Sequence, residues 1–434
     1  MCIRDSLAQR VKEKGLDFAV LYGDREHFAN IEYFSRYDCR FEEALLIVSS
    51  EGKRWIVVGN EGEAYTNFIP YEIKVLRYRN FSLQGQPREN CPNLAELLAS
   101  VGICSGSRIG LAGYKYFEPA IIEDGFDVPE YIVSVLRKLV GYENVNEFTR
   151  ELTGLPHGLR MTVRHPVEVA YIEYKATKVA NCIRRMFKAL KPGISELELS
   201  KAAKIDFSPT QTHSMVNFGP NSLSMGIRSP SPKVYLQRGN VMSFAHSERG
   251  SLVCRAALAA ESIHDVRPEM RHMVDDFYGV YWKAVAVWYE TIGVGCVGGE
   301  LYGKVYDLIG EDRFGFALNP GHYIGGDEWV NTPFISNSKT TVHSGSHIQC
   351  DIIAGCSDPV ATAICEDTIV IADAGLRTRI KEEYPELWQR ILTRQTFMRE
   401  KLGIAIGDDV LPMSNINGVM FPFMFNTDLM FAGQ

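Results

Sequence analysis

Two acidic residues stand inside stretches that otherwise look like buried β-strands. Asp351 is preceded by His-Ile-Gln-Cys and followed by Ile-Ile, and Glu366 stands in Ala-Ile-Cys-Glu-Asp-Thr-Ile-Val-Ile. Most Asp and Glu side chains are exposed, and an unpaired charge in an apolar setting is expensive. Upstream, His322 lies in the turn-forming segment Asn-Pro-Gly-His-Tyr-Ile-Gly-Gly. A glycine-framed histidine followed by two such carboxylates has the make-up of a metal or catalytic site.

The length and composition of the chain limit its class. A chain of 434 residues is too long for one ordinary core, which favours two domains. Hydrophobic residues make up 46% and charged residues 23%, values typical of a soluble globular protein. The net charge of −7 argues against nucleic acid or an anionic membrane as a partner. No run approaches the roughly 18 apolar residues that span a bilayer.

The ten cysteines are scattered without CxxC pairs. In a chain of this size that pattern indicates reduced thiols and a cytoplasmic location. Residues 1–6 have no apolar region after them, so they are not a signal peptide. They resemble a sequencing-adapter or assembly scar and are predicted to be an artefactual leader.

Residues 7–158 are predicted to form a first, α/β domain. Short apolar runs such as Phe18-Ala-Val-Leu-Tyr and Arg108-Ile-Gly-Leu-Ala alternate with helical segments such as Tyr131–Leu139. No catalytic constellation is visible in this part of the sequence.

Residues 159–376 are predicted to form a second domain with an internal pseudo-two-fold. Pro166 opens a long amphipathic helix, because apolar residues recur at three- and four-residue steps from Val169 to Leu190. A matching helix follows Pro268. Each long helix is followed by a turn, a short helix and β-like segments, which predicts helix pairs packed on a sheet.

Residues 377–434 are predicted to form an extension of the second domain. Leu387–Leu402 has the pattern of an amphipathic helix, and Val410–Phe425 is an apolar segment interrupted by prolines. An exposed apolar tail would be an interaction patch. We expect it to pack over the body of the protein or on a neighbouring subunit.

Six phrases of the chain, in their order and spacing, resemble the pita-bread family of methionine aminopeptidase, Xaa-Pro aminopeptidase, prolidase and creatinase. The resemblance implies a creatinase-like N-terminal α/β domain followed by a pita-bread domain, an α/β (α+β) fold, and commonly a homodimer. The phrases are Arg164-His-Pro-Val-Glu, Lys191-Pro-Gly-Ile-Ser-Glu, Phe218-Gly-Pro-Asn-Ser, Asn319-Pro-Gly-His, Ser344-Gly-Ser-His-Ile-Gln-Cys-Asp and Cys365-Glu-Asp-Thr.

The resemblance also implies positions for metal ligands. Peptidases of the family hold two divalent ions with Asp, Asp, His, Glu and Glu, in that order. The matching positions here are Ser243, Cys254, His322, Asp351 and Glu366. Both Asp residues are therefore replaced, and the first Glu is shortened to Asp.

This ligand set limits the metal content. Cys254, His322, Asp351 and Glu366 offer four donors for a single ion. We expect no cofactor or one divalent ion (Zn, Mn or Fe), and so a mononuclear site at most. Cys254 could equally be a small buried hydrophobe.

The histidines that the family uses near the substrate are also replaced. The upstream histidine aligns near Met225 and the second near Trp329. His213 and His246 are close in sequence and are candidate substitutes in substrate binding. Asp327-Glu328, after His322, would add negative charge there.

The implied function is that of an aminopeptidase P-like or creatinase-like hydrolase with His322, Asp351 and Glu366 as catalytic residues. It would cleave a C–N bond in a small-molecule or dipeptide-like substrate, or in an amidino or amide compound. Creatinase does so without metal, with carboxylates holding the cationic substrate. The alternatives are a non-catalytic pita-bread binding protein and a C–S lyase like the family member that cleaves dimethylsulfoniopropionate.

Overall fold

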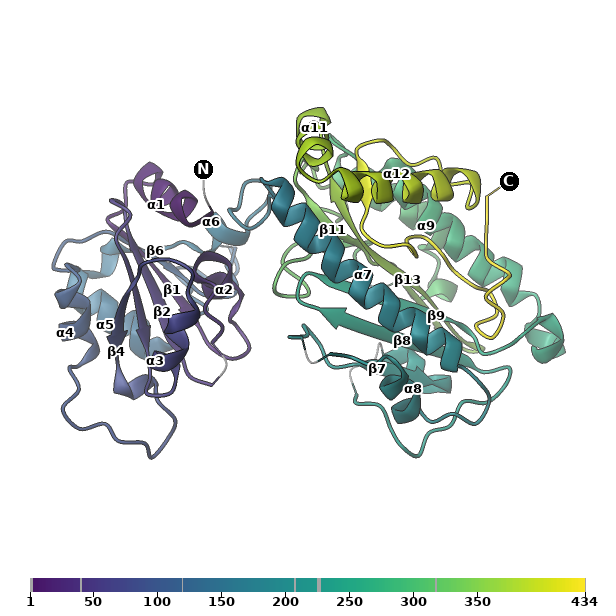
Figure 1. Ribbon diagram of the computed structural model, residues 1–434, viewed down its shortest axis with the longest axis horizontal. Coiled ribbons are helices and arrows are strands. Elements are labelled where there is room, and N and C mark those ends of the chain that lie inside the picture. The colour runs from purple at the N-terminus through teal and green to yellow at the C-terminus, as the bar shows by residue number, and fades with distance from the viewer. Residues whose placement is uncertain are drawn as a thin grey trace. The chain divides into compact units, whose positions relative to one another are not determined.

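The chain divides into two units, Met1–Arg160 and Met161–Gln434. The structure is a computed structural model that describes residues 3–39, 41–118, 120–206, 208–224, 228–316 and 318–433 (Figure 1). Each unit is built on its own β-sheet. The two-domain α/β architecture predicted from the sequence is confirmed.

The first unit contains a six-stranded mixed sheet in the order β4-β3-β2-β1-β5-β6. β1 pairs antiparallel with β2 and parallel with β5. The strands are β1 (Phe18–Gly23), β2 (Ala44–Ser49), β3 (Arg54–Val58), β4 (Lys74–Arg77), β5 (Ile109–Ala112) and β6 (Val145–Glu147).

Helices cover both faces of this sheet. Successive strand residues point to opposite faces, so neighbouring residues of β1 contact different helices. Val20 packs with α4 and α5, whereas Ala19 and Leu21 pack with α1, α2 and α6. α1 includes residues of the predicted leader, and the Asp5 carboxylate accepts a hydrogen bond from Arg54 at 2.9 Å. The helices are α1 (Ile3–Glu13), α2 (Ala29–Ser35), α3 (Gly62–Tyr65), α4 (Leu94–Ser100), α5 (Glu130–Val140) and α6 (Thr149–Thr153).

The second unit contains an eight-stranded sheet. Six strands follow the order β10-β11-β13-β9-β8-β7, and β12 and β14 pair with β13. All of these pairings are antiparallel. The strands are β7 (Met215–Phe218), β8 (Val241–Glu248), β9 (Ser251–Leu258), β10 (His322–Tyr323), β11 (His347–Cys350), β12 (Ile353–Ser357), β13 (Val360–Ile371) and β14 (Val410–Pro412).

Two pairs of helices pack on the sheet as the sequence predicted, although α9 is no longer than its companion α10. α7 lies along β8 and β9, and α9 contacts β11 and β13 (Figure 1). Pro166 occupies the first turn of α7, and Ser195 caps α8 by accepting the amide of Glu198. The helices are α7 (Pro166–Ala189), α8 (Glu196–Ala202), α9 (Val280–Thr291), α10 (Gly298–Ile309), α11 (Ala374–Glu383) and α12 (Pro385–Glu400).

The C-terminal segment packs over the body of the second unit. β14 extends the sheet by pairing with β13, and Leu411 and Met413 join the core between α7, α11 and α12. Among the described residues, no helix is long and apolar enough to cross a membrane.

Candidate metal centre

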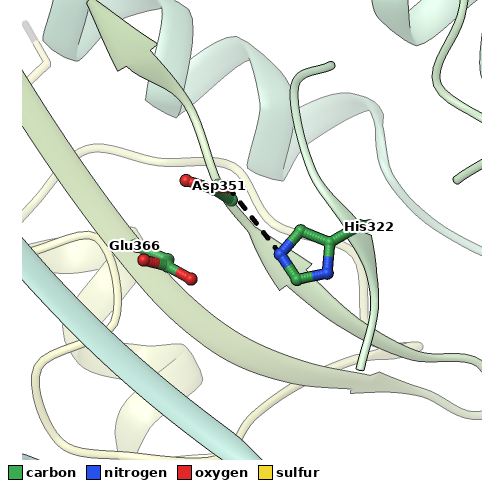
Figure 2. A group of neighbouring side chains, drawn as sticks. All are labelled: His322, Asp351 and Glu366. Atoms are coloured by element: carbon green, nitrogen blue, oxygen red, sulfur yellow. Dashed lines mark ion pairs between the residues drawn. The ribbon is translucent and has the colours of Figure 1, made fainter. Parts of the chain in front are cut away.

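The structure brings His322, Asp351 and Glu366 together on one face of the second sheet (Figure 2). One ligand atom from each residue lies within 4.8 Å of those of the other two. The residues come from β10, from the end of β11 and from β13, which are neighbours in the sheet. All three side chains are buried. No other such group of metal-binding side chains occurs in the part of the chain that is described.

The backbone at Gly321 places the His322 ring. Gly321 has a φ of +112°, and a Cβ atom there would approach the Gln349 carbonyl oxygen to 2.5 Å, so only glycine fits. The Trp288 indole donates to the Pro320 carbonyl at 2.5 Å and holds the same turn from the helical side. On the next residue, His322 Nδ1 lies 3.1 Å from the Tyr323 carbonyl oxygen. This contact assigns the proton to Nδ1 and leaves Nε2 as the ligating atom.

His322 Nε2 faces two carboxylates. Glu328 Oε1 lies 3.2 Å away and Asp351 Oδ2 lies 3.7 Å away. Burial opposes protonation of this ring, but the Glu328 and Asp351 charges outweigh it and raise the pKa of His322. The Trp329 ring stacks on the imidazole with centroids 4.2 Å apart. A protonated Nε2 can donate to Glu328, and a bound cation would take the place of that proton beside the two carboxylates.

The Asp351 carboxylate is buried and incompletely bonded. In the described part of the chain its Oδ1 atom has no hydrogen-bond partner. Burial raises the pKa of Asp351 to about 7, although the nearby His322 charge opposes this. The residue follows directly after β11, which ends at Cys350.

The Glu366 carboxylate is oriented by a chain of side chains. Its Oε1 atom accepts from the Gln349 amide at 2.9 Å, and that amide also donates to the Leu252 carbonyl at 2.7 Å. Thr368 in turn donates to the Gln349 side-chain oxygen at 2.5 Å. Burial and the neighbouring Asp351 charge raise the pKa of Glu366 well above its usual value. Gln349 therefore holds the Glu366 carboxylate in place, whereas burial favours the protonated form of that carboxylate.

The donors fit one divalent ion. One imidazole and two carboxylates are a normal three-residue set for a catalytic ion that keeps a position for water. His322 Nε2 is buried with only its ion pair to Glu328, and Asp351 Oδ1 is buried with no hydrogen bond to any residue that the structure describes. Buried polar atoms are rarely left so, and a bound cation would satisfy both.

Cys254 and Ser243, the two other ligand positions that the family resemblance implies, lie on the same face of the sheet. Neither belongs to the group formed by His322, Asp351 and Glu366. Cys254 stands opposite Glu366 in the ladder between β9 and β13. It belongs to a small apolar cluster with Ala245, Leu252 and Ala256, and it is not one of the residues whose ligand atoms converge. Burial, with the Glu366 and Asp351 charges, raises the pKa of the Cys254 thiol well above its usual value. The structure therefore brings together three of the four expected donors, without Cys254. Ser243, also buried, pairs with Ala256 one step further along the sheet.

His246 lies on the wrong face to bind substrate at this site. It follows Ala245, and successive strand residues alternate between faces. Burial lowers the pKa of His246 to about 4, and the charges around it are those of Glu248, Arg185, Asp206 and Lys178 on the α7 side. This correction removes His246 from the candidate substrate-binding residues.

The other predicted substrate-binding residues lie in loops. His213 is exposed, and its loop contacts the loop after His322, since the Gln211 amide donates to the Gly325 carbonyl at 2.9 Å. Glu328 reaches His322, and Asp327 precedes it in the same loop. Met225 lies outside the described residues.

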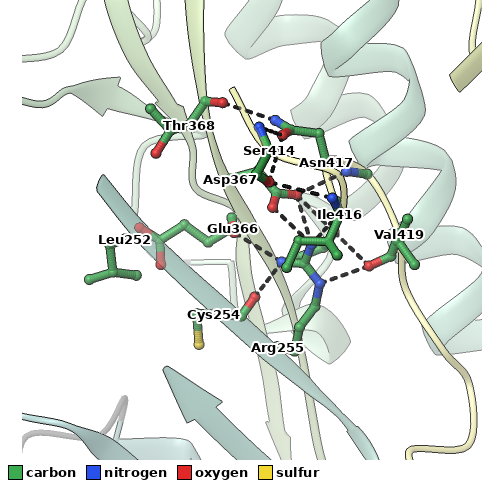
Figure 3. Close-up of polar contacts among 12 residues, drawn as sticks. Leu252, Cys254, Arg255, Glu366, Asp367, Thr368, Ser414, Ile416, Asn417 and Val419 are labelled. Carbon is green, nitrogen blue, oxygen red and sulfur yellow. Dashed lines mark hydrogen bonds and ion pairs between the residues drawn. The ribbon is translucent and has the colours of Figure 1, made fainter. Parts of the chain in front are cut away.

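Two side chains that the sequence did not single out, Arg255 (Figure 3) and Tyr281, support the centre from the opposite face of the sheet. Arg255 donates to the carbonyl oxygens of Cys254 and Glu366, at 2.7 and 2.9 Å. Tyr281 donates its hydroxyl to the Ile352 carbonyl and accepts from the Cys365 amide, both at 2.7 Å. Glu366 is one of the three central residues. Ile352 follows Asp351 in the chain, Cys365 precedes Glu366, and Cys254 pairs with Glu366 across the sheet. A buried arginine or tyrosine in an apolar run has no sequence signal that separates this role from ordinary core packing.

The Asn217 side chain on the same face is also unexpected. It pairs with Ser243 across β7 and β8. Both of its amide atoms are buried and make no hydrogen bond among the described residues. It therefore offers polar atoms at the far edge of the face that carries the three central residues.

Comparison with known proteins identifies the fold. No family profile and no curated protein matches the sequence. Solved structures do match. The Xaa-Pro dipeptidase from Bacillus anthracis superposes with a TM-score of 0.63 at 14% identity over 86% of this chain and 95% of its own. The X-Pro aminopeptidase from Thermotoga maritima gives 0.64 at 13% over 85% and 95%, and the prolidase from Pyrococcus furiosus gives 0.62 at 15% over 85% and 97%. The chain thus has the fold of the pita-bread peptidases, as the resemblance implied.

Proposed function

We propose, from the premise of a pita-bread peptidase fold, that this protein is a hydrolase that cleaves a C–N bond. Its substrate would be a small peptide-like, amide or amidino compound. Its centre would hold at most one divalent ion, bound by His322, Asp351 and Glu366. The solved structures of similar fold include dipeptidases and prolidases.

One observation carries this proposal. Three ligand atoms from distant parts of the chain converge within 4.8 Å in a buried place, and the nearby Asp351 Oδ1 has no hydrogen bond among the described residues. Burying two carboxylates beside an imidazole with so few partners is unfavourable. A binding scaffold without chemistry has no need for this arrangement.

Each residue of the site would have its own role in the reaction. Nε2 of His322, with Asp351 and Glu366, would hold the ion, and Gln349 keeps the Glu366 carboxylate in place. An ion so held supplies Lewis acidity and lowers the pKa of a bound water. Glu328 is partly exposed and lies beside Nε2, so its Oε1 would take a proton from an attacking water. Trp329 covers one face of the imidazole and excludes water from that side.

Metal analysis combined with a substrate screen tests this proposal. We expect no more than one Zn, Mn or Fe ion per chain, and turnover of a dipeptide or small amide that chelator abolishes. Asp351→Asn and Glu366→Gln should lose both the ion and the turnover, whereas the exposed control Glu261→Gln should keep both.

Other results would contradict the proposal in distinct ways. Turnover of a guanidino compound in chelator would favour metal-free chemistry as in creatinase. Cleavage of a C–S bond would favour the lyase. Absence of both metal and turnover would favour a binding protein. The homodimer and the cytoplasmic location stay predictions, which sedimentation and cell fractionation would check.

A further inference from the structure

A hollow in the first unit combines aromatic walls with buried negative charge. Its volume is about 570 Å³, within the usual range for small-molecule sites. Tyr37 is buried at its back, and Phe68 is 72% exposed at its rim. It lies next to α3, in the unit that does not carry the candidate metal centre. Its described lining residues are Tyr37, Asp38, Phe41, Glu42, Glu61, Gly62, Ala64, Tyr65 and Phe68.

Three aromatic rings follow one another along this hollow. The Tyr37 and Tyr65 rings have centroids 5.5 Å apart, and those of Tyr65 and Phe68 are 5.3 Å apart. The planes are tilted by 60° and 45°, so the rings do not stack flat on one another. Aromatic rings that line a hollow together with a carboxylate can hold an organic cation.

Glu42 supplies a carboxylate oxygen that the protein leaves unsatisfied. The side chain is only 5% exposed. Its Oε2 atom accepts from the backbone amides of Glu61 and Gly62, at 3.0 and 2.9 Å. Its Oε1 atom is buried and has no hydrogen bond to any of the described residues. Glu61 differs, because its Oε1 atom already accepts from Gln86 at 2.7 Å.

We propose that this hollow binds an alkylated ammonium cation, with Glu42 as its counter-ion and Tyr37, Tyr65 and Phe68 as its walls. An anion is excluded by the carboxylates. A hard cation such as Ca²⁺ needs six or more oxygen ligands, whereas the walls here are mainly rings. A neutral apolar molecule would leave the buried Glu42 oxygen without compensation. An ammonium ion with methyl groups satisfies both the rings and the charge.

Calorimetric titration of the full chain with choline, as a probe of this chemistry, tests the proposal. Its neutral isostere 3,3-dimethyl-1-butanol has the same shape without the charge. We expect choline to bind at least about tenfold more tightly than the isostere, since the charge carries the recognition. Equal affinity for both compounds, or no saturable choline binding, would overturn the proposal.

Matched variants locate the binding. Glu42→Gln keeps an oxygen for the two backbone amides and removes the charge, and we expect it to weaken choline about tenfold or more. Phe68→Leu should weaken it several-fold. The controls are Glu51→Gln, an exposed carboxylate of the same unit, and Tyr306→Leu, an exposed ring of the other unit. Choline binding that survives Glu42→Gln but is lost in Glu366→Gln would place the cation at the metal centre and contradict the proposal. Thermal unfolding checks that each variant is folded.

Discussion

Arg255 donates to both carboxylate oxygens of Asp367, at 2.8 and 2.9 Å, and neither side chain is more than 2% exposed. The pair joins β9 to β13 on the face opposite the candidate metal centre (Figure 3). A buried ion pair is not a large net source of stability, but losing one partner leaves an uncompensated charge.

Asp367→Asn should therefore destabilise the second unit by about 3–5 kcal/mol. Urea unfolding followed by tryptophan fluorescence would measure this change, because Trp282 and Trp288 lie in that unit. Glu63→Gln breaks the half-exposed pair with Arg77 and serves as the control. Its expected effect is below about 1 kcal/mol. Equal losses in the two variants would show that the buried pair has no special role.

Tyr281→Phe should weaken metal binding without touching a ligand. The change removes the hydroxyl that joins Ile352 to Cys365, and leaves a buried carbonyl and a buried amide unpaired. Each unpaired group costs about 1–3 kcal/mol. The control is Tyr71→Phe, which loses a hydroxyl bonded to the Phe34 carbonyl in the first unit. Metal titration should separate the two variants; equal metal affinity would mean that Tyr281 is structural only.

Cys254→Ala should leave metal binding intact, since the thiol is not part of the converging group. Elemental analysis of the purified variant would check this. Loss of the ion would instead restore Cys254 as a fourth ligand.

Replacing Ser243 and Cys254 together by Asp should raise the capacity from one ion to two. Both positions lie on the face of the candidate centre, and the family resemblance places the missing carboxylates there. The double variant should be less stable in chelator and regain stability when metal is added, because binding to the folded state shifts the unfolding equilibrium. A charge-matched control is the exposed pair Cys104→Asp and Ser105→Asp. An unchanged stoichiometry would show that the face no longer has room for a second ion.

Acid should destabilise the second unit through His246. Its pKa is lowered from 6.5 to about 4 in the folded state, so between these values the unfolded chain binds a proton that the folded chain does not. Stability is then complete above pH 6.5 and falls as the pH drops toward 4, by up to about 3 kcal/mol. His246→Gln should flatten this dependence in urea unfolding at several pH values, whereas the exposed His264→Gln should not. Identical pH slopes in both variants would assign the acid sensitivity to other groups.

The long helices and the central residues were predictable because their signals are local. Apolar spacing and Pro166 marked α7. The predicted second helix is interrupted, since Val274–Gly279 form a π-helix before α9 begins. One extra residue in a turn leaves an apolar pattern readable but shifts the helix boundary.

Only those residues of the candidate site that have a signal in the local sequence were predictable. His322 and the two acids stand in recognisable phrases. The face on which His246 lies depends on strand register, in which one residue reverses the direction of a side chain. Tyr281 acts through partners distant in sequence, and Asn217 reaches this face only because it pairs with Ser243 in the sheet, so their residue types alone carried no signal.

The hydrogen bonds between Arg255 and the C-terminal segment have a consequence for the order in which the protein folds during synthesis. Besides Asp367, its guanidinium donates to the carbonyl oxygens of Ile416 and Val419, at 2.6 and 2.7 Å, and Asp367 also accepts the Gly418 amide. A nascent chain that has not yet reached these residues can form the strands that bear Asp351 and Glu366, but not the contacts that hold them from behind. During synthesis the centre is therefore completed last, and a chain terminated before residue 416 should accumulate without it.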